Sequence, residues 1–512
     1  MSECGNAVAR CLKVRHWFSL VIVCALGLIP GRAAQQTSAN APAASINLDK
    51  MVSVLNYGAK RTCQKDAGGF PIHATVPTPE STGTDISNAP WNKYPERWYK
   101  WDFVKKYPVA ERRDKPFRNS DTWDFIAIQR AVFENQFGTI WFPEGVYYVN
   151  QTIVINGTME FMDSQDGVSF YGGGGVKTAI QGFDESKDTV HMNFAGKCPM
   201  FFFGVSFSGK PGTNYSGNTA AVHLSHCNQI NFMNCWFTCR TYAIKIDQKS
   251  QDCSVTSCTF EFYRCAIWIE TAQAMTLANN KFWNLDGGPL PYPNPSGQGN
   301  LAGNAITIAN CSVQAGLTPS INISNNIFEN YYLKTFNPGI AWINVLNSKN
   351  VSISNNVFKL TVLGIRCTGS ATDGATEYVT ITGNTGEGCL GKSMGSFLQI
   401  SSYASFINVT GNTFHTDGPV AISLIRNNLT SPPVRNALIT GNLFSVKADP
   451  KMPNHSAIMS LTQGSSFGTG SDNVQISNNL ITGAGAISRT PGLNMTGSPN
   501  VMNQNNLVST GE

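Results

Sequence analysis

One short phrase recurs along the second half of the sequence, and it constrains the fold more than any other feature. It reads Ile-Ser-Asn-Asn-Ile-Phe at residues 323–328 and returns with small changes at 353–358, 409–414, 439–444 and 476–480. Apolar and polar residues alternate within the phrase, which is the period of a β-strand. Asn or Gly then follows, and these residues most readily adopt the left-handed backbone of a tight turn. Repetition of such a unit predicts an all-β fold, a parallel solenoid.

Each coil of this solenoid divides into three short strands. In one coil the first strand is expected at residues 341–346, the second at 351–354 and the third at 357–360. The pattern extends from about residue 140 to about residue 505, which gives about a dozen coils of one supersecondary unit each.

Two interior columns follow from aligning the coils. Phenylalanine recurs at the end of the phrase, with Gly386 in its place in one coil. Two positions earlier stands a column that begins as Cys235 and Cys258 and continues as asparagine: Asn280, Asn326, Asn356, Asn384, Asn412 and Asn442. Each asparagine amide is expected to bond to the turn one coil away. The two cysteines are interpreted as core thiols, with a metal site or a disulfide framework as the alternatives.

The composition fits a turn-rich all-β protein. Charged residues make up 13% of the chain and glycines number 47. The formal net charge is +5 without a basic stripe, so nucleic acid is not an expected partner. Residues 1–34 resemble a signal peptide and 35–45 a flexible linker, which predicts a secreted or periplasmic protein. A membrane is expected as a partner only if residues 1–34 stay uncleaved as an anchor.

Residues 46–139 differ from the coils and are interpreted as an N-terminal cap on a parallel β-helix spanning 140–512. A strand is expected at 52–55, and a helix at 121–135 with Ser120 or Asp121 as its N-cap. Such a helix would cover the open strand edges of the first coil. The insertion at 62–118 is rich in aromatic residues: Trp91, Tyr94, Trp98, Tyr99, Trp101 and Tyr107. It is either a packed surface insertion, or a sugar platform or subunit contact.

The cap also carries a family resemblance. Tyr-Gly-Ala-Lys at 57–60, Ala-Ile-Gln at 127–129 and Trp-Phe-Pro-Glu-Gly-Val-Tyr at 141–147 resemble the N-terminal pattern of the pectate-lyase-like superfamily. Its members are right-handed parallel β-helices that include polygalacturonases, rhamnogalacturonases, pectate lyases, uronan epimerases and phage tailspikes. The resemblance implies a carbohydrate-active scaffold with a polysaccharide substrate, and it leaves room for a homotrimer.

The catalytic signatures of these relatives are missing from the sequence. The chain has no Asn-Thr-Asp, Gly-Asp-Asp, Gly-His-Gly and Arg-Ile-Lys set of a polygalacturonase, and no Asp-Pro-His of an epimerase. An acidic calcium cluster is also not visible. No metal or cofactor is therefore expected, except calcium if the protein is a lyase. The fold by itself does not supply the reaction.

Stacking the first strands places residues from successive coils side by side. Because the aliphatic residues alternate inward, the others face outward in two columns. The first column is His191, His223, Lys245, Trp268, Thr307, Asn344 and Arg366. The second column is Asn193, Ser225, Asp247, Glu270 and Ala309.

Asp247 and Glu270 are the predicted catalytic pair. They lie one coil apart in the second column, with their Cβ atoms expected about 5 Å from each other. Repulsion should then raise the pKa of one of the two carboxyls, as an acid and nucleophile pair of a glycoside hydrolase requires. Lys245 and His223 would tune the pair or act as a base. The alternative is that these outward residues form a polar ladder whose only role is to keep the surface soluble.

Four further residues are predicted to bind the sugar. Trp268 offers a flat aromatic face, and Tyr292 lies in the loop 285–303 expected beside the same face. Asn344 and Arg366 continue the first column.

Other sites and functions stay open. Glu261 and Glu329 form a rival acid pair on the third strand, two coils apart. A polysaccharide lyase or uronan epimerase would use Lys245 as the base, with Arg264 or Arg366 neutralising a uronate. A non-catalytic solenoid that binds glycan is the third interpretation.

Overall fold

The computed structural model describes most of the chain beyond residue 50, and the structural statements below refer to those residues. They are 51–61, 89–90, 92–93, 99–102, 107–110, 116–135, 138–156, 168–174, 177–184, 186–193, 199–209, 218–283, 304–311, 319–329, 341–359, 363–389, 396–416, 420–447, 457–462, 470–483, 493–495, 498 and 500–509. They belong to one compact unit, Ile46–Glu512. The predicted signal peptide and linker lie outside them. No helix in the described ranges combines the length and apolar character that crossing a bilayer requires.

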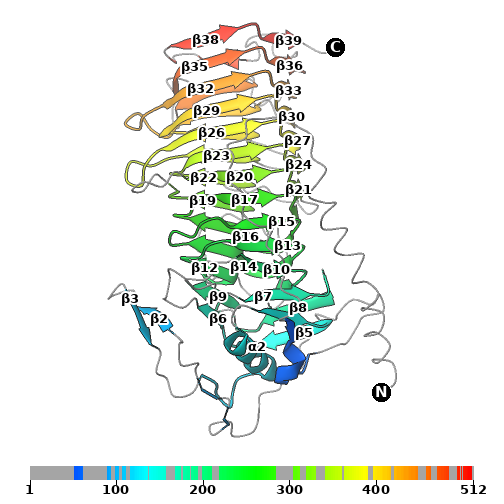
Figure 1. Ribbon diagram of the computed structural model, residues 1–512. Coiled ribbons are helices and arrows are strands. Elements are labelled where there is room, and N and C mark those ends of the chain that lie inside the picture. The colour runs from blue at the N-terminus through cyan, green and yellow to red at the C-terminus, as the bar shows by residue number, and fades with distance from the viewer. Residues whose placement is uncertain are drawn as a thin grey trace. The chain divides into compact units, whose positions relative to one another are not determined.

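The strands stack in parallel into three faces of a β-helix (Figure 1). The second-strand face is a 14-stranded sheet in the described part of the chain. It consists of β1 (Met51–Ser53), β4 (Thr139–Phe142), β7 (Ser169–Gly172), β10 (Met200–Phe203), β13 (Ile230–Met233), β15 (Ser254–Thr256), β17 (Met275–Ala278), β20 (Ile321–Ser324), β23 (Lys349–Ser354), β26 (Thr376–Thr382), β29 (Ala404–Thr410), β32 (Val434–Thr440), β35 (Ser471–Ser477) and β38 (Val501–Gln504).

The other two faces form one 23-stranded sheet, because two long strands turn the corner between them. These are β14 (Trp236–Asp247) and β16 (Thr259–Glu270). The first-strand face adds β6 (Ile153–Asn156), β9 (Val190–Asn193), β12 (Ala220–Ser225), β19 (Ile306–Ala309), β22 (Ile343–Leu346), β25 (Ile365–Thr368), β28 (Leu398–Ser401), β31 (Ile422–Arg426), β34 (Ile458–Thr462) and β37 (Leu493–Asn494). The third-strand face adds β5 (Gly145–Val149), β8 (Thr178–Gly182), β11 (Ser206–Ser208), β18 (Lys281–Trp283), β21 (Ile327–Glu329), β24 (Val357–Lys359), β27 (Thr385–Cys389), β30 (Thr413–Thr416), β33 (Leu443–Ser445), β36 (Leu480–Thr482) and β39 (Leu507–Ser509).

A stack of phenylalanine rings fills the interior behind the third-strand face. The stacked rings belong to Phe207, Phe237, Phe260, Phe282, Phe328 and Phe358, with centroids 4.7–5.4 Å apart. Gly386 pairs with Phe358, as the coil alignment predicts. A Cβ on Gly386 would overlap the ring of Phe397. The missing side chain therefore makes room for Phe397, which packs between Phe358 and Phe414.

The predicted asparagine ladder is confirmed and runs through the turns beside this stack. Asn384 is typical: its Oδ1 accepts from the backbone N–H of Asn356 at 2.9 Å and from Nδ2 of Asn356 at 3.0 Å. Its Nδ2 donates to the carbonyl of Ile353 and to Oδ1 of Asn412, both at 2.9 Å. The residue before each ladder asparagine has a left-handed backbone, with φ of 55° at Asn355 and 66° at Gly383. The ladder therefore satisfies buried turn groups and fixes the register of successive coils.

The predicted core thiols are also confirmed. Cys235 and Cys258 are free and buried, at 2% and 1% exposure. Burial raises the pKa of the Cys258 thiol well above its ordinary value. These two cysteines therefore serve as small interior residues, and the disulfide alternative is wrong for them.

Helix α2 (Trp123–Glu134) covers the edge of the first coil, as expected. Gln129 donates to the carbonyl of Val154 at 2.9 Å and accepts from its N–H at 2.8 Å. Asp124 accepts from the N–H of Tyr148 at 2.9 Å. Side chains of the helix thus supply the hydrogen bonds that a preceding coil would otherwise give to edge strands β6 and β5.

Two boundaries in the cap differ from the sequence expectation. The N-cap of α2 is Thr122, whose Oγ1 accepts from the N–H of Phe125, rather than Ser120 or Asp121. Asp121 instead accepts from the N–H of Arg118 within the preceding turn. The first strand ends at Ser53, because the chain then enters a 3₁₀ turn, η2 (Val54–Tyr57).

Only part of the aromatic insertion falls within the described ranges. Strands β2 (Tyr99–Asp102) and β3 (Tyr107–Ala110) form an antiparallel hairpin. Trp91, Tyr94 and Trp98 lie outside those ranges. Neither the surface interpretation nor the sugar-platform interpretation of the insertion is tested.

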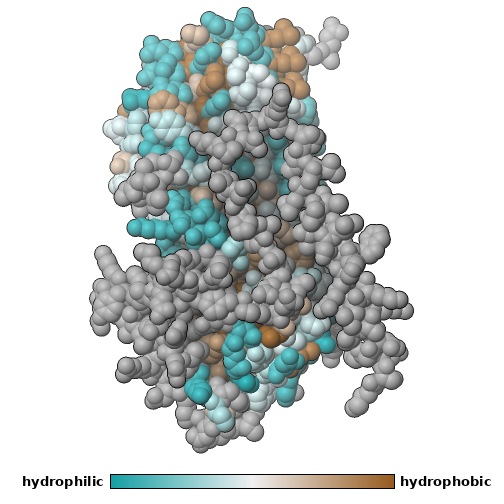
Figure 2. Space-filling model, viewed as in Figure 1, coloured by the Kyte–Doolittle hydropathy of each residue, from teal (hydrophilic) through white to brown (hydrophobic). Residues whose placement is uncertain are grey.

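The outer surface of the C-terminal coils is mostly hydrophilic in the view of Figure 2. Hydrophobic patches lie near β36 and β39. Leu480 and Leu507, on these strands, are 37% and 65% exposed. The apolar residues of the other coils are largely used in the interior.

The ladder generates a stability prediction. Asn384→Ala should lower the free energy of unfolding by on the order of 3 kcal/mol. The substitution leaves the buried N–H of Asn356 and the carbonyl of Ile353 without a hydrogen-bond partner. The urea midpoint followed by circular dichroism measures the loss. Asn427→Ala, at an exposed asparagine outside the ladder, is the matched control and should leave the midpoint unchanged. Equal midpoints for the two variants would contradict a stabilising role for the ladder.

Candidate active site

The outward columns of the first-strand face have the register that the repeat predicts. His191 pairs with His223, His223 with Lys245, and Lys245 with Trp268. The column continues from Trp268 through Thr307 and Asn344 to Arg366. In the second column Ser225 pairs with Asp247, and Glu270 occupies the equivalent position of the next strand. The aliphatic residues between them are fully buried, so these polar side chains share one outer face.

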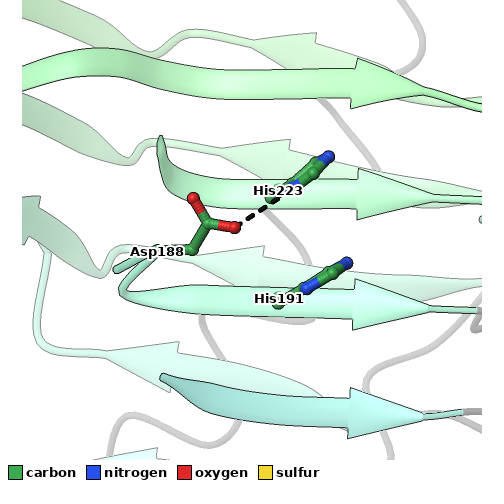
Figure 3. Close-up of side chains that lie close together, drawn as sticks. All are labelled: Asp188, His191 and His223. Atoms are coloured by element: carbon green, nitrogen blue, oxygen red, sulfur yellow. Dashed lines mark hydrogen bonds and ion pairs between the residues drawn. The ribbon is translucent and has the colours of Figure 1, made fainter. Parts of the chain in front are cut away.

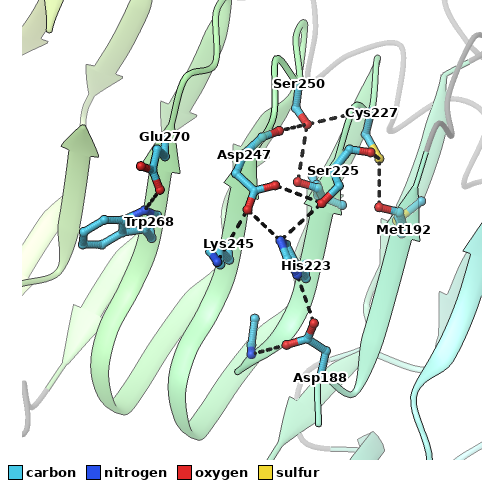
Figure 4. Close-up of polar contacts among 12 residues, drawn as sticks. Asp188, Met192, His223, Ser225, Cys227, Lys245, Asp247, Ser250, Trp268 and Glu270 are labelled. Carbon is cyan, nitrogen blue, oxygen red and sulfur yellow. Dashed lines mark hydrogen bonds and ion pairs between the residues drawn. The ribbon is translucent and has the colours of Figure 1, made fainter. Parts of the chain in front are cut away.

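His223 lies between two carboxylates and contacts both (Figure 4). Its Nδ1 is 3.0 Å from Oδ2 of Asp188, and its Nε2 is 2.9 Å from Oδ2 of Asp247. Burial alone would lower the pKa of His223, but the hydrogen bonds and negative charges of both aspartates raise it to about 9. The imidazole is therefore a cation at neutral pH and donates to a carboxylate on each side.

Asp247 is held as an anion by several donors. The hydroxyl of Ser225 donates to its Oδ1 at 2.9 Å, and Nζ of Lys245 lies 3.5 Å from its Oδ2. Burial tends to raise the pKa of Asp247, but His223, Ser225 and Lys245 together lower it below the ordinary value. Asp247 is therefore not a carboxyl with a raised pKa, because His223, Ser225 and Lys245 outweigh the effect of burial.

Glu270 is turned away from Asp247 toward partners of its own. Nε1 of Trp268 donates to its Oε2 at 3.1 Å, and Nδ2 of Asn310 donates to its Oε1 at 3.4 Å. Asn310 belongs to the following coil, whereas Ser225 and His223 belong to the coil before Asp247. The two carboxylates therefore lie on adjacent strands but lean in opposite directions along the helix axis (Figure 4).

Trp268 is held by two contacts. Its indole N–H is used by Glu270, and the ring of Tyr242 meets it edge to face at 5.8 Å between centroids. The ring of Trp268, which is predicted to bind sugar, therefore has a fixed orientation.

His191 stacks on His223 with its ring centroid 4.6 Å away and the planes 10° apart. Burial and the neighbouring positive charge of His223 lower the pKa of His191 to about 4. The Nε2 of His191 is buried without a hydrogen-bond partner. A neutral imidazole and an imidazolium are thus in face-to-face contact at neutral pH.

Asp188, His191 and His223 also form a group whose ligand atoms lie within 4.8 Å of one another (Figure 3). Metal ligation needs imidazole lone pairs that point at one centre. Two parallel rings stacked face to face direct their in-plane lone pairs side by side instead. Both nitrogens of His223 are also engaged by carboxylates. The arrangement therefore fits a hydrogen-bonded proton network better than a metal site.

Several predicted residues lie elsewhere or outside the described ranges. Glu261 and Glu329 share a column on the third-strand face, separated by Trp283. Glu329 lies 3.9 Å from both Lys281 and Lys359, so its charge is shared by two loose ion pairs. Tyr292 and the side chain of Arg264 are not among the described residues.

Two residues that contact the predicted site residues, Asp188 and Asn310, were not predicted from the sequence. Asp188 lies in the turn between β8 and β9, where coils differ in length, so alignment of the strands gives it no column. Its carboxylate also accepts from the N–H of Ala220 at 2.7 Å, which anchors it beside His223. Asn310 follows directly after β19, and its side chain holds Glu270. The available signal was position near a terminus of a first strand, two residues before β9 for Asp188 and directly after β19 for Asn310.

Comparisons with known proteins identify the fold. No family model matches the chain, and no curated protein sequence matches it. The structure resembles the catalytic unit of a GH87 α-1,3-glucanase from Streptomyces thermodiastaticus, with TM-score 0.50 and 14% identity over 91% of this chain and 70% of that one. It also resembles the A-module of the mannuronan C-5 epimerase AlgE6 from Azotobacter vinelandii (TM-score 0.49, 12% identity, 76% of this chain and 96% of that one). An exopolygalacturonase from Thermotoga maritima matches at TM-score 0.45 and 11% identity, over 85% of this chain and 93% of that one. The chain is thus a right-handed parallel β-helix, as the sequence resemblance implied.

The histidine pair generates a titration prediction. NMR of histidine-labelled protein should show His223 titrating near pH 9 and His191 near pH 4. His223 has a raised pKa, so its contribution to stability is complete below pH 6.5 and is lost as the pH rises through 9. His191 has a lowered pKa, so its contribution is complete above pH 6.5 and is lost as the pH falls through 4.

The control for this titration is Asp188→Asn, which removes one of the two carboxylates from His223. The pKa of His223 should then fall toward its ordinary value of 6.5. An unchanged pKa of His223 in this variant would show that Asp188 does not help to keep the imidazole charged.

Proposed function

We propose that this protein is a polysaccharide-active enzyme, and that its reaction is hydrolysis of a glycosidic bond by Asp247 and Glu270. The observation that carries the proposal is the clamp of His223 between Asp188 and Asp247 on an outward face. Several half-buried charges on an outer face are costly to assemble and are not needed to keep a surface soluble. Groups with strongly shifted pKa values cluster at functional sites.

The environments of the two carboxylates suggest different roles. Asp247 is kept ionised by its neighbours, so it would act as the general base that takes a proton from water. Glu270 would protonate the oxygen of the departing sugar. The water oxygen would bond to the anomeric carbon while the bond to the departing oxygen breaks.

The separation of the two carboxylates favours inversion of configuration. Adjacent strands lie about 4.8 Å apart, and here the two carboxylates lean away from each other toward different coils. Their separation should therefore exceed the roughly 5–5.5 Å of retaining enzymes and approach the roughly 6.5–9.5 Å of inverting ones. The acid and nucleophile pair predicted from the sequence spacing is thereby replaced by an acid and a base.

The structural comparisons show the fold and leave the substrate to the assays. The glucanase acts, by its name, on an α-1,3-glucan. At 14% identity that likeness shows the fold alone. The residues of the first-strand face therefore carry the proposal.

The cellular setting is part of the same proposal. Export through the signal peptide at residues 1–34 would bring the enzyme to a polysaccharide outside the cytoplasm, in the medium or the periplasm. Assembly into a homo-oligomer such as a trimer is compatible with this setting.

Substitution of the pair tests the proposal. The assay measures the release of reducing ends from whichever polysaccharide of a test panel the wild type hydrolyses. Asp247→Asn and Glu270→Gln should each reduce this release by at least about 100-fold, the usual range for losing a general acid or base. Glu329→Gln removes a carboxylate from the rival pair and should leave the activity unchanged. Wild-type activity in both Asp247→Asn and Glu270→Gln, or a loss confined to Glu329→Gln, would refute the assignment.

A second candidate is proton abstraction by a lyase or epimerase. The observation that favours it is the contact of His191 with His223, since groups with oppositely shifted pKa values are suited to act as base and acid. Lys245, beside Asp247, would be an alternative base.

The second candidate makes its own prediction. A lyase would produce unsaturated uronate, which absorbs ultraviolet light, without a matching uptake of water. An epimerase would incorporate deuterium from heavy water into the sugar without shortening the polymer. Loss of these signals in His191→Gln, with a normal far-ultraviolet spectrum, would support this chemistry. Chain shortening without either signal would support hydrolysis.

A further inference from the structure

Two polar side chains on the first-strand face are shielded from solvent without the partners that they need. Asn344 in β22 and Arg366 in β25 are paired in register on adjacent strands. Asn344 is 7% exposed, and its Oδ1 has no hydrogen-bond partner. The Nε of Arg366 also lacks a partner, and no ion pair of Arg366 is found in the described part of the chain. An acceptor and a cationic donor are thus left unsatisfied side by side.

Both groups are energetically costly in this state. A shielded amide oxygen without a donor loses the hydrogen bond that water would give it, and an unpaired, partly buried cation loses still more. Burial alone lowers the pKa of the Arg366 guanidinium. Lys245 in the same column differs, because it has Asp247 as a counter-ion. The cost at Arg366 would be offset by a ligand that brings the missing anion.

The chemistry of the two side chains defines this ligand. Guanidinium presents a planar fork of N–H donors that suits carboxylate or sulfate oxygens. The Oδ1 of Asn344 needs a donor, and a sugar hydroxyl is one. We propose that Asn344 and Arg366 form a subsite for an acidic sugar, whose anionic group binds Arg366 while a hydroxyl donates to Asn344. This subsite deepens the proposed function, on which it rests for its polysaccharide ligand.

The position of the subsite indicates how the polymer lies. Arg366 is four strands beyond Asp247 along the first-strand face, through β16, β19 and β22 to β25. At about 4.8 Å per strand this is roughly 19 Å. One sugar ring cannot span that distance. The ligand is therefore an oligosaccharide or polymer that lies along the helix axis and carries its anionic group several sugars from the bond that reacts.

Binding of acidic polymers tests the subsite independently of turnover. The probes are sodium polygalacturonate and alginate, each compared with its carboxyl-reduced neutral form, and dextran sulfate compared with dextran. Titration calorimetry is done on Asp247→Asn, which binds without turning over, with and without Arg366→Gln. The affinity for at least one acidic probe should fall at least tenfold in the Arg366→Gln variant. The corresponding neutral polymer should bind weakly to both proteins.

Two further variants separate binding from folding. Asn344→Asp places a carboxylate beside Arg366, so it should abolish binding of the acidic probe while leaving the thermal midpoint unchanged or higher. Arg435→Gln removes an arginine from the second-strand face and should change neither the affinity nor the midpoint. A lower midpoint for Asn344→Asp would show that Arg366 is not short of a counter-ion, and would overturn the proposal.

Each remaining outcome supports or overturns either the subsite or the proposed hydrolysis. Dependence on the carboxylates of polygalacturonate or alginate identifies a uronic acid, and dependence on dextran sulfate identifies a sulfated sugar. Binding that is equal for acidic and neutral polymers, unchanged in Arg366→Gln, or lacking for every acidic probe overturns the subsite. Affinity that depends on Arg366, with no product released by the wild type, would uphold the subsite and refute the proposed hydrolysis. Product release with an affinity independent of Arg366 would do the reverse.

Discussion

The in-register stacking of coils is the constraint on which the rest of this structure depends. The ladder through Asn356 and Asn384 satisfies buried turn groups with side-chain amides, so a shifted coil would leave those groups unpaired. The phenylalanine stack adds a second periodic contact that favours the same register. Because both run inside the helix, they fix which outward residues become neighbours. A site on the outer face is thus positioned by interior contacts.

The candidate site shows how such a scaffold can concentrate charge. His223 on β12 reaches forward to Asp247 on β14 and toward Asp188 in the turn before β9. Each group comes from a different coil, so none could meet the others in a short peptide. The two aspartates keep His223 charged, and His223 in turn keeps Asp247 ionised. Burial, together with the positive charge of the stacked His223, lowers the pKa of His191. One partly buried cation therefore contributes to the protonation states of Asp247 and His191.

Sequence reasoning located the face but gave an incomplete picture of its chemistry. The periodicity placed Asp247 and Glu270 on adjacent strands, because a strand column needs only the spacing of apolar residues. It could not locate Asp188, because turns between strands vary in length and carry no period. The sequence also did not show that the pKa of Asp247 is lowered, because this depends on the charged His223 that lies between Asp188 and Asp247. Side-chain direction likewise escaped the pattern, since Glu270 leans toward Asn310.

The sequence by itself determined the parallel β-helix, the interior ladders, the capping helix and the order of residues along each outward column. Each of these follows from a local pattern, namely alternation, a left-handed turn residue or an amphipathic period. Only the tertiary structure decided which polar atoms meet and which remain without partners, as at Asn344 and Arg366. That outcome depends on rotamers, on turns of irregular length and on burial by neighbouring coils. These are properties of the packed molecule, and no short window of residues encodes them.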